Sequence, residues 1–255
     1  EPFTGNPAAV CLPDVEPSAG WMQQIAAEMN LSETAFAWPS GDGYGLRWFT
    51  PVAEVDLCGH ATLATAFALW ETGRVDCDDD ISFTTRSGML EVRREQDMIK
   101  MNFPAEPATS CKPPNGLAEA LGAEILWCGQ NRMDHLVEVA NEQTLLDLRP
   151  DFTSLARLDT RGVIVTAAAE RDNVDFVSRF FCPVLGIDED PVTGSAHCCL
   201  APFWAGRLGR DELTGFQASQ RGGVVCCEVV CDRVELSGRA VKIFSGTMSA
   251  PPAGA

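Results

Sequence analysis

The sequence has few positive charges: 19 Lys and Arg residues stand against 36 Asp and Glu, for a formal net charge of −17. This balance argues against a nucleic-acid backbone or an anionic membrane as a partner. No apolar run approaches the roughly 20 residues that a membrane-spanning helix needs, so we expect a soluble protein. An acidic surface does not determine the electrostatic potential inside a pocket, so a small carboxylate substrate is not excluded.

Metal and cofactor motifs are missing as well. The chain has 3 histidines, and its 11 cysteines show no C-x2-C spacing, so the pattern lacks the four ligands of a structural zinc site. Nucleotide and flavin motifs are also absent. We predict no metal and no cofactor. The odd cysteine count, the lack of a secretory signal and the apolar surroundings predict reduced thiols in the cytoplasm.

The chain repeats itself. Its 255 residues reach the size at which one core usually becomes two. Residues 47–52 read Arg-Trp-Phe-Thr-Pro-Val and residues 179–184 read Arg-Phe-Phe-Cys-Pro-Val. Each block ends a strand–turn–strand pattern and precedes a run of small residues, at 59–67 and 194–201. This order of elements predicts an internal duplication.

The small-residue runs predict two central helices. Residues 61–70 are apolar or small nearly all round, so this helix must be buried on every side, with strands wrapped around it as a barrel. Short helices are expected at 18–29, capped by Ser18, and at 152–158. Further strands are expected at 81–85, 89–93, 98–103, 136–139, 224–230, 233–236 and 240–244.

These elements predict an α+β fold of two strand-rich halves, each wrapped on one helix. Several prolines between Pro104 and Pro114 mark the passage from one half to the other. The predicted domains are 1–104 and 105–255, and the last strand of the chain is allowed to return to the first domain.

Both central helices begin at a glycine, Gly59 or Gly194, followed by a polar residue. The unbonded N–H groups and the positive dipole end of such a start bind carboxylates. Two helix starts facing one cleft between the halves would hold a small acid at both ends. Tight packing alone would also explain each glycine.

Three residues of the first half are candidates for acid–base chemistry. His60 lies in a first helical turn, where the dipole disfavours the imidazolium, so we expect a neutral imidazole; a core histidine is the alternative. Cys58 is read as a small buried residue rather than a reactive thiol. Glu33 stands at the entry to an apolar strand, where partial burial would favour its protonated form and suit acid–base catalysis; a solvated charge is the alternative.

The second half offers an acidic run, 188–190, of which we expect one carboxylate to cap the second central helix. Asp190 ends this run. Ser195 is a second capping candidate or a donor to a substrate carboxylate. Gly222 and Gly223 either turn the chain or let the backbone approach a ligand closely.

Five ordered blocks carry a resemblance to a known family. They read Gly-Asn-Pro-Ala-Ala-Val at 5–10, Ser-Glu-Thr-Ala-Phe at 32–36, Cys-Gly-His-Ala-Thr at 58–62, Asp-Pro-Val-Thr-Gly-Ser-Ala-His at 190–197 and Ser-Gln-Arg-Gly-Gly at 219–223. Essentially the whole chain resembles PhzF-like proteins, relatives of the phenazine-biosynthesis isomerase and, more distantly, of diaminopimelate epimerase. The resemblance implies two epimerase-like domains, each a barrel around a central helix, a homodimer, and a further strand before Glu1.

The resemblance also implies roles. In the phenazine enzyme a glutamate at the position of Glu33 shuttles a proton between carbons of a cyclic dienic amino acid, and His60, Asp190 and Ser195 match residues of the same pocket. We therefore predict an isomerase acting on a small, carboxylate-bearing, unsaturated substrate. Glu33, His60 and Asp190 are the predicted catalytic residues, and the predicted substrate-binding residues are Asn6, Gly59, Gly194, Ser195, Gly222 and Gly223.

Two alternatives stay open. The related epimerases use two facing thiols, and Cys58 matches the first, but the second half has Asp190 and Pro191 where the partner should be. Cys198 and Cys199 lie inside the helix. An epimerase or racemase using Cys58 with another partner is the weaker reading, and a non-catalytic small-molecule-binding protein is the other.

Overall fold

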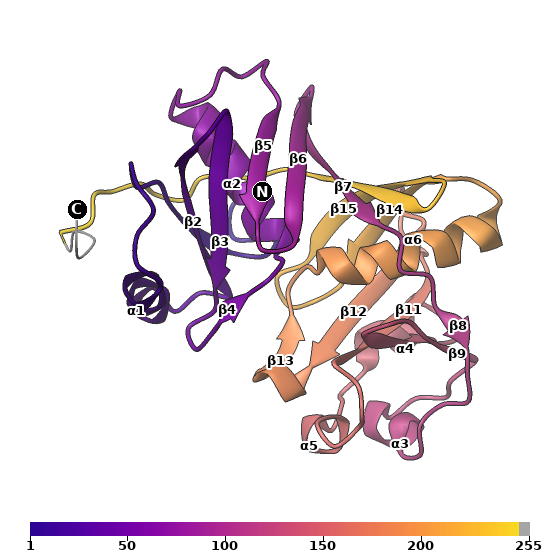
Figure 1. The fold of residues 1–255 in the computed structure, drawn as a ribbon. Coiled ribbons are helices and arrows are strands. Elements are labelled where there is room, and N and C mark those ends of the chain that lie inside the picture. The colour runs from indigo at the N-terminus through magenta and orange to yellow at the C-terminus, as the bar shows by residue number, and fades with distance from the viewer. Residues whose placement is uncertain (250–255) are drawn as a thin grey trace. The chain divides into compact units, whose positions relative to one another are not determined.

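The computed structural model describes residues 1–249, which divide into two compact units (Figure 1). Unit 1 comprises Glu1–Phe3, Pro7–Asn102 and the described residues from Ser237 onward. Unit 2 comprises Thr4–Asn6 and Phe103–Leu236. The predicted domains, 1–104 and 105–255, differ from these units because Thr4–Asn6 belongs to unit 2 and the described residues from Ser237 onward belong to unit 1.

Unit 1 is a sheet with two helices. Its strands follow the order β1-β2-β3-β5-β6-β7, and β4 pairs with β3. β1 is parallel to β2 and β3 is parallel to β5, whereas the other pairs in this order are antiparallel. The elements are β1 Ala8–Cys11, α1 Ala19–Met29, β2 Glu33–Ser40, β3 Gly43–Phe49, β4 Glu54–Val55, α2 Gly59–Glu71, β5 Ile81–Thr85, β6 Gly88–Glu95 and β7 Met98–Pro104.

Unit 2 has a longer sheet of order β16-β15-β14-β12-β11-β10-β9-β8, with β13 paired to β12. β10 is parallel to β11 and β12 is parallel to β14. Its strands are β8 Thr109–Ser110, β9 Trp127–Gln130, β10 Asp134–Glu138, β11 Gly162–Ala168, β12 Phe176–Cys182, β13 Ile187–Asp190, β14 Glu212–Gln217, β15 Gly223–Val230 and β16 Arg233–Gly238. Its helices are α3 Leu117–Leu121, α4 Glu142–Asp147, α5 Phe152–Leu155, the 3-10 turn η1 Pro183–Leu185 and α6 Gly194–Leu208.

The two units share an order of elements. In each, a parallel strand pair is followed by an antiparallel strand, a small-residue helix and a parallel return strand: β1, β2, β3, α2, β5 in unit 1 and β10, β11, β12, α6, β14 in unit 2. Arg47 donates to both carboxylate oxygens of Glu54 at 2.6 and 2.7 Å, and Arg179 donates likewise to Glu189 at 2.7 and 2.9 Å. The whole is a mixed, sheet-rich α/β fold.

Some local predictions are confirmed and others are wrong. Ser18 caps α1 by accepting from the backbone N–H of Trp21 at 3.3 Å, as expected. The helix expected at 152–158 ends at Leu155. No strand forms at 240–244, where Ile243 and Phe244 are 58% and 74% exposed, because apolar alternation makes a strand only where a partner strand is available. No helix of the described residues is long and apolar enough to cross a membrane.

Candidate active site

Alternation along β2 decides which way Glu33 points. Phe36 packs with Met22 of α1, so the even-numbered side chains of this strand face α1. Successive side chains of a strand point to opposite faces, which places Glu33 with Ala35 on the other face, toward α2. Glu33 is also the first residue of β2, so a regular strand fixes its backbone.

The start of α2 fixes Cys58 and His60. Cys58 is the N-cap, in an extended conformation with φ −144°, and its side chain makes no capping bond. Its carbonyl accepts from the N–H of Thr62 at 3.1 Å and from the hydroxyl of Thr62 at 2.6 Å. Because no side chain caps α2, the first N–H groups of the helix stay available to an anion.

Glu33, Cys58 and His60 meet in unit 1, and we call them the α2 cluster. The distance from Nε2 of His60 to Oε2 of Glu33 is 3.1 Å, and from Nδ1 of His60 to Sγ of Cys58 it is 3.5 Å. The side chains of His60 and Glu33 are 17% and 15% exposed, and Cys58 is buried. The Oε2 atom of Glu33 is buried and accepts no well-formed hydrogen bond.

The pKa of His60 is shifted in the direction opposite to the one that the helix dipole predicts. Burial lowers the pKa of His60, but the sulfur of Cys58 and the carboxylate of Glu33 oppose burial and prevail, so this pKa is raised well above its ordinary value. Burial also raises the pKa of Cys58, which keeps the thiol protonated near neutral pH. This upward shift runs against the expected neutral imidazole, because the raising effects of Cys58, the larger, and of Glu33 together exceed the lowering effect of burial.

Cys58 should react slowly with alkylating agents, because its thiol is buried and its pKa is raised. Cys77 and Cys231 are exposed. With iodoacetamide at neutral pH, we expect these two thiols to be modified on the order of tenfold faster than Cys58 or more. Peptide mass spectrometry over a time course measures the three rates. A Cys58 that reacts first would contradict the prediction and favour a thiol-based epimerase.

In unit 2, the loop before α6 is organised by polar contacts. The carboxylate of Asp190 accepts from Nδ2 of Asn6 at 2.9 Å and from the hydroxyl of Thr193. The buried side chain of Gln217 accepts from the N–H of Thr193 at 2.8 Å and donates to the carbonyl of Asp190 at 2.7 Å. The N-cap of α6 is Thr193, without a side-chain capping bond. The expected carboxylate cap from 188–190 is wrong, because Asp190 binds the Thr193 hydroxyl instead.

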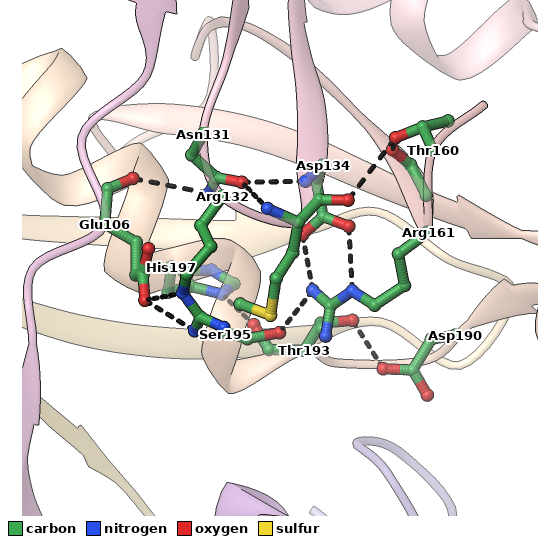
Figure 2. A network of polar contacts seen from close by, with 12 residues as sticks. Glu106, Asn131, Arg132, Asp134, Thr160, Arg161, Asp190, Thr193, Ser195 and His197 are labelled. Atoms are coloured by element: carbon green, nitrogen blue, oxygen red, sulfur yellow. Dashed lines mark hydrogen bonds and ion pairs between the residues drawn. The ribbon is translucent and has the colours of Figure 1, made fainter.

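Ser195, in the first turn of α6, has an arginine beside it. Figure 2 shows Arg161 between Asp134 and Ser195; its Nη2 lies 3.0 Å from the Ser195 hydroxyl. Arg161 also donates from Nε to Asp134 at 2.8 Å, and a second bond joins Nη2 to the other carboxylate oxygen. The Asp134 side chain is fully buried, whereas that of Arg161 is 29% exposed. A guanidinium fixed by a buried carboxylate therefore adds positive charge at the start of α6.

Of the four candidate glycines, Gly59 lies in unit 1 and the other three lie in unit 2. Gly222 has φ +66°, a conformation that favours glycine, and its carbonyl accepts from the N–H of Gly5 at 2.7 Å. A Cβ on Gly223 would lie 2.4 Å from Cγ2 of Val192. Both glycines thus have a packing role, beside the chain segment that carries Asn6. Gly59 and Gly194 are the first residues of α2 and α6, as expected.

Sequence reasoning missed Arg161, Asp134 and Gln217. Arg161 directly precedes the apolar strand β11, and a charge at the entry to an apolar strand is the signal that identified Glu33. The same signal could have identified Arg161. Asp134 and Gln217 gave no signal of this kind, because the groups that their side chains bind, Arg161 and the loop of Asp190 and Thr193, are distant in sequence.

His197 makes unit 2 sensitive to acid. Its ring is fully buried, Nδ1 lies 2.8 Å from the carbonyl of Thr193, and Nε2 has no partner. Burial lowers the pKa of His197 to about 4. The pKa of His197 in the folded state therefore lies below its unfolded value of about 6.5. The free energy of unfolding has its full value above pH 6.5, and it falls by about 3 kcal/mol as the pH is lowered to 4.

Urea unfolding at pH 7, 5.5 and 4, together with NMR titration of the three histidines, measures this effect. We expect His197 to remain neutral down to about pH 4 while His60 remains charged above its ordinary range. A His197 that titrates near 6.5 would contradict the prediction.

Residues 1–246 match the sequence profile of the phenazine biosynthesis-like protein family, PhzC-PhzF. An uncharacterized isomerase of Halalkalibacterium halodurans is 49% identical over 243 residues, which cover 95% of this chain and 92% of the relative. An uncharacterized isomerase of Pseudomonas aeruginosa is 51% identical over 250 residues, covering 97% and 94%.

A solved structure agrees with these relatives. The crystal structure of a PhzF-family phenazine biosynthesis protein from Enterococcus faecalis matches with a TM-score of 0.90 and 44% identity, covering 94% of this chain and 91% of that chain. Profile, relatives and fold coincide over nearly the whole sequence. This chain therefore belongs to the PhzF family of phenazine biosynthesis-like isomerases.

Proposed function

We propose that this enzyme moves a proton on a small, carboxylate-bearing, unsaturated substrate, and that side chains do the chemistry without a cofactor. Glu33 takes the proton from one carbon and returns it to another. The observation that carries the proposal is the α2 cluster, in which Oε2 of Glu33 lies 3.1 Å from Nε2 of His60 but accepts no well-aligned hydrogen bond. A general base needs such a free lone pair on a rigid element.

His60 supports this role through its charge. An imidazolium beside Glu33 keeps the carboxylate ready to accept a proton, and it stabilises negative charge that develops on the substrate as a carbon–hydrogen bond breaks. The upward direction of the His60 pKa shift favours that charge. Cys58 stays a protonated neighbour in this scheme, because burial raises its pKa.

We assign recognition of the substrate carboxylate to the start of α6. The helix is uncapped by side chains, so its first N–H groups, the hydroxyl of Ser195 and the guanidinium of Arg161 are available as donors. Asn6 and Thr193 hold Asp190, to which we assign a role in polarising the substrate or relaying the proton.

Solvent deuterium exchange tests the proposal. The enzyme is incubated in D2O with a panel of small unsaturated acids and amino acids, and mass spectrometry follows deuterium entering each compound. We expect label in one structural class only, dependent on Glu33. Label that persists in Glu33→Gln but vanishes when Cys58 is alkylated would overturn the assignment.

A second candidate function rests on one observation. The thiol of Cys58 lies 3.5 Å from Nδ1 of His60, which could accept its proton, so an epimerase using Cys58 as base has a geometric basis. The matching N-cap position of α6 is Thr193, and the nearby Cys198 and Cys199 have pKa values that burial raises to about 12. Unit 2 therefore offers no evident second thiol, and we favour the carboxylate mechanism.

We further propose that the two units are epimerase-like domains descended from one duplicated ancestor. Their shared order of elements supports this, as does the paired arginine–glutamate contact made by Arg47 with Glu54 and by Arg179 with Glu189. Closure of each sheet into a barrel around α2 or α6 is part of the same proposal.

A further inference from the structure

Three different donor atoms converge in the α2 cluster. The sulfur of Cys58, a ring nitrogen of His60 and a carboxylate oxygen of Glu33 all lie within 4.8 Å of one another. Nε2 of His60 is 3.1 Å from Oε2 of Glu33 and 4.0 Å from Sγ of Cys58. In a tetrahedral zinc site with bonds of about 2.0–2.3 Å, neighbouring donors lie about 3.3–3.7 Å apart. The observed distances bracket this spacing, so small side-chain shifts would let one ion reach all three.

The chemistry of the donors selects the ion. Thiolate, imidazole and carboxylate together suit a borderline-soft divalent cation such as Zn²⁺, and three protein ligands leave a fourth position for water. Oε2 of Glu33 is a buried atom that accepts no well-aligned hydrogen bond, although Nε2 of His60 lies 3.1 Å away. Cys58 and His60 come from one helix start and Glu33 from the first residue of a strand, so the three donors are already assembled.

A second group of possible metal donors in unit 1 lacks the features that support the α2 cluster. Asp76, Cys77 and Asp78 also lie close together, but they are consecutive, all exposed and without an imidazole. Exposed acidic residues in a turn hold no ion by themselves, so this group carries no proposal. It provides a matched control, since its cysteine is of the same kind in the same unit.

We propose that the α2 cluster is a chelating site for Zn²⁺ and related borderline-soft divalent cations, and that the bound ion inhibits the enzyme. Binding replaces the thiol proton of Cys58 and any proton on the ligating nitrogen of His60, and these protons pass to water. Inhibition rests on the proposed function, because the ion would occupy the lone pairs of Glu33 and remove the imidazolium charge of His60; chelation itself does not rest on it.

Cobalt titration of the metal-stripped full chain tests chelation. Co²⁺ bound to a thiolate gives a charge-transfer absorption in the near ultraviolet, and Zn²⁺ added afterwards should remove it by competition. We expect the wild type to bind one equivalent of Co²⁺ with this absorption. The absorption should be lost in Cys58→Ser and retained in Cys77→Ser. Loss of a group that merely supports a ligand costs about 10–100-fold in affinity. Loss of a ligand in His60→Gln or Glu33→Gln should therefore cost roughly 100-fold or more.

Several results would overturn the site. A charge-transfer band that survives in Cys58→Ser, or that disappears in Cys77→Ser, would place the ion elsewhere. Should Cys58→Ser unfold, His60→Gln at its half-buried position decides the question, because unchanged cobalt affinity there excludes the cluster.

Deuterium exchange in the presence of Zn²⁺ separates the two parts of the proposal. Inhibition should follow the zinc occupancy measured by cobalt displacement and should be reversed by a chelator. Occupancy without inhibition would leave the chelating site standing and would contradict both the inhibition and the catalytic role of the cluster. Inhibition without any cobalt band would overturn the chelating site alone.

Discussion

Replacing Glu33 with Gln should lower solvent deuterium exchange into the substrate by about 10²–10⁴-fold, the usual cost of removing a general acid–base residue. Gln keeps the size of the side chain but cannot take up a proton. Deuterium incorporation per minute, followed by mass spectrometry, measures the loss. Glu28→Gln is the control, because Glu28 is exposed on α1 and should leave the rate unchanged.

The same variant has a readout that needs no substrate. Glu33 helps to raise the pKa of His60, so the pKa of His60 should fall in Glu33→Gln while those of His135 and His197 stay where they are. The chain has 3 histidines, which makes the NMR titration direct. Full exchange activity combined with an unmoved His60 would remove Glu33 from the mechanism altogether.

Replacing Arg161 with Met should destabilise unit 2 by about 3–5 kcal/mol, because the fully buried carboxylate of Asp134 would lose its counter-charge. Burial already raises the pKa of Asp134 even with Arg161 in place. The penalty should therefore shrink as the pH is lowered, since a protonated Asp134 needs no partner. Urea unfolding midpoints at pH 7 and pH 4.5 measure both effects.

Two further variants show whether the unpaired buried charge of Asp134 causes the destabilisation in Arg161→Met. Arg132→Met breaks a pair with Glu106 in which the arginine is 69% exposed, and it should cost less than about 1 kcal/mol. The double change Arg161→Met with Asp134→Leu should recover much of the loss, because no charge then stays buried. A double variant as unstable as Arg161→Met alone would point to packing against Phe180, over which the guanidinium lies.

Much of the fold could be predicted because its signals are local. Strand runs such as 81–85 and the Ser18 cap of α1 depend on neighbouring residues, and the structure confirms them. The predicted strand at 240–244 failed because a strand also needs a partner, which local alternation does not reveal. The resemblance to PhzF-like proteins was carried by five short blocks, and the comparisons confirm the family.

The candidate site was harder to predict than the fold, because its chemistry depends on contacts between segments that are distant in sequence. The order of motifs indicated Glu33 and His60, and the structure brings them together, but the pKa of His60 is raised, against the expected direction. The helix dipole is a local feature and was easy to apply, whereas the raising groups are Cys58 and then Glu33, which lies in a strand elsewhere in the sequence. Arg161 and Asp134 were missed for the same reason: their pairing appears only when β10 lies beside β11.

The division into units determines which unit is completed first during synthesis. Unit 2 needs Thr4–Asn6, made first, and then the continuous stretch Phe103–Leu236. Unit 1 needs residues from Ser237 onward in addition to Pro7–Asn102. On the ribosome, where domains generally fold as their residues emerge, unit 2 therefore has all its residues before unit 1 does. The unit that carries Glu33 and His60 is begun early and is the last to be completed.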